Sequence, residues 1–149
     1  MTQTTLPEGM DFPLEGVRVL DLSRVFAGPL CGQVLADFGA EVIKVEHPLR
    51  GDDTRDWGMR IGKTETTYYN SMNRNKRSVT LDLQSAEGVQ IIYDLLPQFD
   101  VVIHNFKHGG AVGDGVGVVE LDGVASFERA REAGCALGLH ADHADLGVV

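Results

Sequence analysis

The stretch that decides the fold runs from Val17-Arg-Val-Leu-Asp-Leu22 to Glu41-Val-Ile-Lys-Val-Glu46. Both segments are short and mostly apolar, which is typical of buried parallel strands. Between them, apolar residues recur at three- and four-residue spacing and predict one buried helical face. Pro29 suits the first turn of that helix, and Gly39 suits its left-handed cap. The segments therefore predict a β-α-β unit with a right-handed crossover. The apolar helical positions are Leu30, Cys31, Val34, Leu35 and Phe38.

A second unit of the same kind follows after a long connection over residues 47–76. Ser78-Val-Thr-Leu-Asp-Leu83 alternates polar and apolar residues like a strand, and Asp100-Val-Val-Ile-His-Asn105 reads as the next strand. Ser85 can cap the helix between them, and Pro97 ends it. Two such units predict an α/β fold, with a Rossmann-like parallel sheet and flanking helices. A connection of that length is expected in a compact domain only if it serves a function.

Composition limits the classes of protein to consider. The chain has 149 residues, enough for one ordinary domain, and its 43% hydrophobic and 23% charged fractions are those of a soluble globular protein. No apolar run approaches the ~20 residues that cross a bilayer, and the N-terminus lacks the features of a signal or transit peptide. The two cysteines do not make a disulfide framework. The cytoplasm is the expected compartment, with no membrane partner.

A run of cations stands out because the net charge is −9. Asn73-Arg-Asn-Lys-Arg-Ser78 contains Arg74, Lys76 and Arg77, whereas an acidic protein should have no general affinity for nucleic acid. The run predicts a cationic patch for one specific anionic ligand. The alternative is a solvated hairpin whose charges only keep the protein soluble.

The expected sheet also says where a ligand would bind. Ligands of open α/β sheets bind outside the carboxyl ends of the strands, often against a helix N-terminus. That rule points to residues 23–28, 46–47, 81–84 and 105–106. The sequence has no G-x-G-x-x-G and no Walker-type lysine loop, so NAD and ATP lack their usual motifs.

Other reactive side chains have ordinary structural interpretations. Cys31 could be a nucleophile at a helix start, but it shares the apolar face and is expected to be buried. His104 is interpreted as a strand residue, and Asp52 and Asp53 as loop salt-bridge partners of Arg55. Four residues of the C-terminal tail have metal-like spacing, but a glycine-rich tail seldom builds a second shell, so no metal is expected. These four are His140, Asp142, His143 and Asp145.

The chain changes character after about Lys107. Half of its 18 glycines lie at or beyond Gly109, and no clear period follows. A helix is predicted from Ser126 to Leu137, and the last residues have weak structural signals. The expected organisation is an N-terminal tail over 1–15, the sheet-forming part over 16–110, and a divergent Gly-rich tail over 111–149.

Several of these motifs together resemble the opening of a class III CoA-transferase of the CaiB/BaiF family, which includes formyl-CoA, carnitine and succinate-dependent dicarboxylate CoA-transferases. The resemblance runs from about Leu14 to Gly110, with the motifs in order and correctly spaced. Thr64-Glu-Thr-Thr-Tyr-Tyr69 resembles the dicarboxylate branch, and the full Asn-Arg-Asn-Lys-Arg run favours a transferase over the related acyl-CoA racemases. The remaining motifs are Leu14-Glu-Gly-Val-Arg-Val-Leu-Asp-Leu22, Ala27-Gly-Pro29, Leu35-Ala-Asp-Phe-Gly-Ala-Glu-Val-Ile-Lys-Val-Glu46, Gly51-Asp-Asp-Thr-Arg55 and Asn105-Phe106.

The resemblance implies that coenzyme A or an acyl-CoA is bound as substrate, with a small carboxylic acid as its partner. By position, Val25 and Ala27 would lie against the CoA, and Asn105 and Phe106 would flank the pantetheine. The family often has Arg where this chain has His47. The cationic run would attract the phosphates. The residues implied to border the adenosine end are Leu81, Asp82, Leu83 and Gln84.

The family's chemistry uses an Asp carboxylate that attacks the thioester and forms covalent intermediates. In relatives this Asp lies well beyond the Asn-Phe motif, and they add a second domain and form an interlocked homodimer. Here the resemblance fades past Gly110, with Gly113 where an Arg often helps bind CoA, and none of four later aspartates has a matching context. We therefore expect no catalytic Asp, an incomplete large domain and no turnover by the isolated chain. A truncated or frameshifted reading frame and a non-catalytic CoA-binding or poorly folded remnant are the alternatives. The four aspartates are Asp114, Asp122, Asp142 and Asp145.

Overall fold

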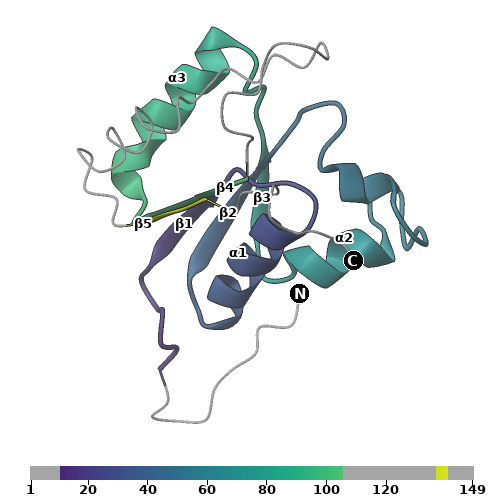
Figure 1. Ribbon diagram of the computed structural model, residues 1–149, viewed down its shortest axis with the longest axis horizontal. Coiled ribbons are helices and arrows are strands. Elements are labelled where there is room, and N and C mark those ends of the chain that lie inside the picture. Colours follow the sequence, from purple (N-terminus) through teal and green to yellow (C-terminus); the bar gives the residue numbers. More distant parts are fainter. Residues whose placement is uncertain (1–10, 106–136, 141–149) are drawn as a thin grey trace, which may run out of the picture.

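The computed structural model describes residues 11–105 and 137–140, and Figure 1 shows their arrangement. Five strands form a single parallel sheet in the order β3-β2-β1-β4-β5. This is the strand order of a Rossmann-like sheet, so the predicted fold class is confirmed. The strands are β1 (Arg18–Asp21), β2 (Glu41–Glu46), β3 (Arg77–Thr80), β4 (Val101–His104) and β5 (Leu137–His140).

The strand order reverses at β1, which is the central strand of the sheet. Leu20 on β1 pairs in register with Ile43 of β2 and with Val102 of β4. The chain therefore runs outward from β1 to β3 on one side and continues with β4 on the other. The carboxyl ends of β1 and β4 meet at this reversal, which is where open α/β sheets bind their ligands.

Helices cover the two faces of the sheet. Figure 1 shows α1 (Ala27–Asp37) on one side and α3 (Ala86–Leu95) on the other. Neighbouring residues of β1 point to opposite faces, as the period of a strand requires. Val19 therefore belongs to the core cluster beneath α1, and Leu20 to the cluster beneath α3. The α1 cluster also contains Ala36, Ala40, Val42 and Ile103, and the α3 cluster contains Leu22, Val45, Ile92, Leu96 and Phe99.

The predicted buried face of α1 is wrong in part. Cys31 and Leu35 pack against the core cluster, but Val34 is 43% exposed and Phe38 is 51% exposed. The reason is a close approach of α1 to β1, because a Cβ on Gly32 would lie 2.9 Å from Oδ2 of Asp21. Such contact selects small or compact residues over large apolar ones. The buried α1 residues are Gly28, Pro29, Gly32, Gln33 and Ala36.

The capping of α3 follows the prediction. The Ser85 hydroxyl accepts a hydrogen bond from the backbone N–H of Gly88 at 2.9 Å, which satisfies a free donor of the first turn. The helix ends at Leu95, and Pro97 lies in the short 3-10 helix η2 (Leu96–Gln98) that follows. Gly39 adopts a φ of 100° directly after α1, as expected for a left-handed cap.

The long connection contains two elements that the sequence did not predict, the 3-10 helix η1 (Asp53–Asp56) and α2 (Thr67–Asn73). Thr66 joins them, because its hydroxyl donates to the carbonyl of Thr54 at 2.7 Å and accepts from the N–H of Tyr69 at 3.1 Å. The connection is thus an ordered unit, and it is anchored at the carboxyl end of β2.

The C-terminal tail differs from the prediction where the structure describes it. Leu137 was assigned to the end of a helix, but it begins β5, which pairs with β4. The rest of that predicted helix, the metal-like residues after His140, and Gly113 lie outside the described residues. The boundaries at residues 15 and 110 stay predictions. No helix within the described ranges is long and apolar enough to cross a membrane.

Candidate functional site at the carboxyl ends of the strands

The loop from β1 to α1 is held by a buried carboxylate. Asp21 is fully buried and accepts hydrogen bonds from the N–H of Ser23 at 3.0 Å and from its hydroxyl. Two residues further on, Val25 has a φ of 73°, a conformation that a β-branched residue adopts only under strain. The Val25 N–H points at the Asp52 carboxylate, 3.3 Å from Oδ2. The loop is therefore fixed in a costly shape at a position predicted to contact CoA.

Asn105 fastens the same loop to the end of β4. Its Oδ1 accepts from the Arg24 N–H at 3.0 Å, and its Nδ2 donates to the Arg24 carbonyl at 2.7 Å. One amide side chain thus satisfies both backbone groups of Arg24 across the reversal point of the sheet. Asn105 has a defined role in shaping the site, whereas Phe106 lies outside the described residues.

A buried ion pair supports this loop from below. Lys44 Nζ lies 2.9 Å from Asp52 Oδ2, and both side chains are 1% exposed. Lys44 also donates to the Ser23 carbonyl at 2.8 Å, and Asp52 accepts from the Thr54 N–H at 3.0 Å. Burial opposes ionisation of Asp52, but the Lys44 charge and these hydrogen bonds outweigh it and lower its pKa. The interpretation of Asp52 as a partner of Arg55 is wrong, because its partner is Lys44.

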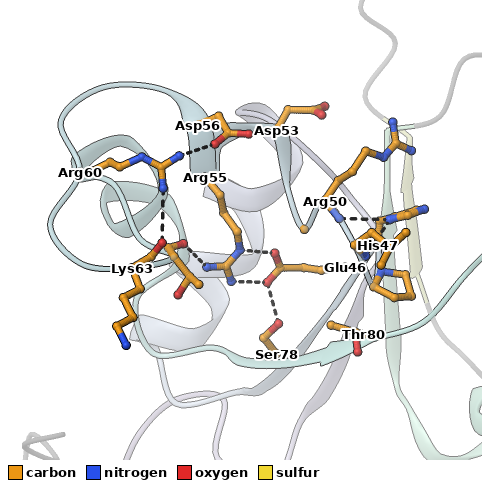
Figure 2. A pocket seen from close by; sticks show the side chains of 14 residues that line it. Glu46, His47, Arg50, Asp53, Arg55, Asp56, Arg60, Lys63, Ser78 and Thr80 are labelled. Atoms are coloured by element: carbon orange, nitrogen blue, oxygen red, sulfur yellow. Dashed lines mark hydrogen bonds and ion pairs between the residues drawn. The ribbon is translucent and has the colours of Figure 1, made fainter.

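Glu46 is the centre of a second buried network, and Figure 2 shows its hydrogen bonds to Arg55 and Ser78. Arg55 donates to its two oxygens from Nε at 2.6 Å and from a terminal nitrogen at 2.7 Å. Tyr69 and Ser78 add hydroxyl donors at 2.8 and 2.6 Å. Burial opposes ionisation, but the hydrogen bonds from Arg55, Ser78 and Tyr69 outweigh it and lower the pKa of Glu46 to about 2. Glu46 is therefore an anion at neutral pH, and it joins β2, β3, η1 and α2.

The cationic run does not form one patch. Arg74 pairs with Asp37, Arg77 pairs with Glu41 at 2.8 Å, and Lys76 Nζ is buried 2.8 Å from Asp21. The expected patch is thus corrected, because each charge is neutralised by a carboxylate from an earlier segment. Burial lowers the pKa of Lys76, and the charge of Asp21 opposes that shift.

Two adjoining cavities open near these strand ends. The larger has a volume of ≈ 590 Å³ and lies between the β2–α2 connection and β3. The smaller has a volume of ≈ 60 Å³, and both are lined by Glu46, His47 and Arg50. The larger cavity is further lined by Pro48, Leu49, Gly51, Asp53, Arg55, Asp56, Arg60, Lys63, Thr64, Ser78 and Thr80. The smaller is further lined by Leu22, Arg24, Val45, Leu81, Asp82, Leu83 and Gln84.

The structure brings together part of the site predicted from sequence. Leu81, Asp82, Leu83 and Gln84 line the smaller cavity with His47. Ala27 is the first residue of α1, and Val25 lies in the loop before it. This loop is bonded to Asp52 through the Val25 N–H and to Asn105 through the Arg24 backbone. Arg74, Lys76 and Arg77 line neither cavity.

Two residues that line the smaller cavity were not predicted. Arg24 lies in the predicted segment 23–28 but was not singled out, and Arg50 lies outside the predicted segments, because a single Arg in a loop carries no spacing signal. Lys44 did offer a signal, because a lysine inside a doubly buried parallel strand requires an anionic partner.

Among the described residues, Cys31 and the buried carboxylates at the strand ends are poorly suited to act as nucleophiles. Burial raises the pKa of the Cys31 thiol, and the charge of Asp21 adds to that shift, so the thiol stays protonated. Asp21, Glu46 and Asp52 are buried and already accept several hydrogen bonds. Within residues 11–105 and 137–140, no group of three or more His, Cys, Asp or Glu is placed to hold a metal ion. The arrangement suits binding of an apolar ring that carries anionic groups.

Comparisons with known proteins agree with this geometry. Residues 14–122 match the family described as CoA-transferase family III. The chain is 49% identical over 113 residues to the human succinyl-CoA:glutarate CoA-transferase, covering 76% of this chain and 26% of that protein. It is 49% identical over 109 residues to a succinyl-CoA–D-citramalate CoA-transferase of Chloroflexus aurantiacus, with 73% and 27% coverage.

A solved structure shows the same relation. The crystal structure of a CaiB/BaiF family protein from Brucella suis superposes with a TM-score of 0.68 at 35% identity, covering 88% of this chain and 33% of that one. A protein from Mycobacterium tuberculosis gives a TM-score of 0.67 at 36% identity. The chain spans about a quarter of the length of the curated relatives that it matches, 26% for the human protein.

Proposed function

The chain belongs to CoA-transferase family III, and from this premise we propose that it binds coenzyme A, free or as an acyl-CoA, at the carboxyl ends of β1, β2 and β3. The parent reaction moves CoA from an acyl-CoA to a carboxylic acid. The observation that carries the proposal is the smaller cavity, whose lining combines apolar and cationic side chains at the edge where such sheets bind ligands.

The adenine ring is assigned to the smaller cavity. Leu81 and Leu83 give its wall two aliphatic side chains, and His47 borders it from the end of β2. The cavity, at ≈ 60 Å³, is too small to enclose the ring, so the ring would lie against its wall at the opening and the ribose and phosphates would extend outward. An apolar slot with a few polar groups is the usual form of a small-molecule site.

The diphosphate and pantetheine are assigned to the β1–α1 loop. The first turn of α1 has no side-chain cap, and the N-terminus of a helix favours a phosphate. Val25 and Ala27 line this approach, and the strained φ of Val25 is consistent with a backbone shaped for a ligand. Asn105 holds the loop in place, on the side where the pantetheine would leave.

Transfer of CoA requires a carboxylate that can attack the thioester. Asp21, Glu46 and Asp52 are buried and serve the interior networks, so we assign none of them this role. The proposal is therefore that the 149-residue chain binds CoA and does not turn it over alone. Because relatives are named for succinyl, glutarate and citramalate substrates, we propose dicarboxylic acids as the acceptor class of the parent reaction.

Calorimetric titration of the 149-residue chain with CoA tests the binding. A matched pair of variants tests where CoA binds. Leu81→Asp places a negative charge in the smaller cavity, and Val79→Asp makes the same kind of change two residues away, outside both cavities. We expect CoA affinity to fall at least about tenfold for Leu81→Asp and to change little for Val79→Asp. Absence of CoA binding by the unmodified chain contradicts the proposal.

Turnover is tested separately. Succinyl-CoA is incubated with glutarate and the chain, and glutaryl-CoA is measured. We expect none above the uncatalysed rate; transfer by the chain alone would show that the assignment of the carboxylates is wrong. A cytoplasmic location and an interlocked homodimer stay predictions from the sequence and the family resemblance, and light scattering of the purified protein tests the dimer.

A further inference from the structure

The described cations fall into two groups. Within residues 11–105, most Lys and Arg side chains lie within ion-pair distance of a carboxylate. Arg24, Arg50 and Lys63 have no such partner among these residues. The paired cations are Arg18, Lys44, Arg55, Arg60, Arg74, Lys76 and Arg77.

The unpaired cations are not scattered over the surface. Arg24 and Arg50 both line the smaller cavity, and Arg50 also lines the larger one with Lys63. Two guanidinium groups that have no carboxylate partner within residues 11–105, both at one apolar slot, therefore indicate a ligand with more than one anionic group.

Coenzyme A has two separate anionic groups near its adenine, the 5′-diphosphate and the ribose 3′-phosphate. The diphosphate connects the ribose to the pantetheine, so its cation should lie on the pantetheine side of the slot. Arg24 lies there, because its backbone is bonded at both ends to Asn105 at the end of β4. On the proposed CoA site, Arg24 is therefore the residue that would bind the diphosphate.

Arg50 comes from a different segment, the connection that follows β2. Its backbone N–H is bonded to His47 Nδ1 at 3.3 Å, which places the residue beside the slot. Figure 2 shows its side chain extending away from the Glu46–Arg55 pair, so that network does not use its charge. Building on the proposed CoA site, we propose that Arg50 binds the ribose 3′-phosphate and so makes the site prefer CoA to dephospho-CoA.

Lys63 provides a matched control for this inference. It is also a cation without a carboxylate partner, but it lines only the larger cavity. In Figure 2 its side chain points away from Glu46, on the side opposite Arg50. A general attraction of the acidic protein's free cations for a polyanion would involve Lys63 as much as Arg50, whereas a 3′-phosphate site would not.

The experiment is a titration of CoA and dephospho-CoA into the 149-residue chain and into its Arg50→Gln, Arg24→Gln and Lys63→Gln variants. We expect the unmodified chain to bind CoA about tenfold more tightly than dephospho-CoA, as one charge-assisted contact allows. Arg50→Gln should remove most of that difference by weakening CoA alone. Arg24→Gln should weaken both ligands by a similar factor, and Lys63→Gln should change neither more than about twofold.

The outcomes separate this inference from the proposed function. If the unmodified chain binds neither ligand, the proposed CoA site is wrong. If it binds CoA but Arg50→Gln weakens both ligands equally or neither, the CoA site stands and the assignment of Arg50 is overturned. Circular dichroism on each variant shows whether it is folded, and the exposed position of Arg50 favours that.

Discussion

Two kinds of cation lie at the carboxyl edge of the sheet: buried lysines that are paired with carboxylates, and cavity arginines that have no carboxylate partner among the described residues. Lys44 and Lys76 are almost fully buried and paired with Asp52 and Asp21. Arg50, a few residues along the chain from Lys44, is exposed and has no carboxylate partner among the described residues. The paired lysines set the shape of the β1–α1 loop, and the arginine is the residue that we propose to bind a ligand. A cation's role is thus decided by its burial and its partner.

Breaking the Lys44–Asp52 pair should have the largest effect. Lys44→Met leaves the Asp52 carboxylate buried without its cation, and loss of one partner of a buried pair costs about 3–5 kcal/mol. The free energy of unfolding from urea titration measures this. The double variant Lys44→Met, Asp52→Leu should recover part of the loss, because it removes the stranded charge. Equal stability of the single variant and the unmodified chain would contradict a structural role.

The second-largest effect is expected from protonation of Glu46 at acid pH. The pKa of Glu46 is about 2 in the folded chain and 4.5 ordinarily, so its ionised form stabilises the fold. That contribution is complete above about pH 4.5 and is lost as the pH falls toward 2, amounting to about 3 kcal/mol. Urea unfolding over this range should show a steeper loss for the unmodified chain than for Glu46→Gln. Parallel pH profiles would mean that Glu46 is not held as an anion.

A smaller change should come from relieving the strained backbone. Val25→Gly removes the steric cost of a positive φ, about 1–3 kcal/mol, while glycine adds about 1 kcal/mol of unfolded-state entropy. We expect the net free energy of unfolding to rise by about 1 kcal/mol. Val79→Gly in the extended strand β3 is the control, and it should lower stability. A loss at Val25 as large as that at Val79 would rule out strain.

The smallest effect is expected at Arg77, whose pair with Glu41 lies at the surface with its side chain 76% exposed. Arg77→Gln should change stability by less than about 0.5 kcal/mol, since exposed pairs contribute little. CoA affinity should also be unchanged, measured by the same titration as for Arg50→Gln. A clear drop in CoA affinity would show that the cationic run contributes to CoA binding, as predicted from the sequence.

The sheet could be predicted because its strands are buried on both faces. Val17–Leu22 and Glu41–Glu46 stand out as apolar runs, and their helix has a clear start and cap. The inward face of α1 could not be read in the same way, since periodicity assumes that large residues point inward. Close approach to Asp21 of β1 instead buries small residues such as Gly32. β5 was missed because four residues with a central glycine give no strand signal.

The site was harder to predict because its charges depend on partners distant in sequence. The run from Arg74 to Arg77 is neutralised by Asp37, Asp21 and Glu41, and only the folded sheet brings these together. Residues 81–84 were placed correctly at the strand ends, because that placement depends on topology alone. Arg50 gave no signal, since what distinguishes it is the lack of a partner.

The buried state of Lys76 has a chemical consequence for the proposed binding of acyl-CoA thioesters. An acyl-CoA is an acylating agent, and an amine with a lowered pKa beside it would be modified. The Lys76 ammonium donates instead to Asp21 Oδ2, to the Pro29 carbonyl at 2.6 Å and to Asn73 Oδ1 at 3.0 Å, so its three protons are occupied. The fold thereby shields this lysine from acylation by the proposed ligand. Among the described lysines, spontaneous acylation should concentrate on exposed Lys63.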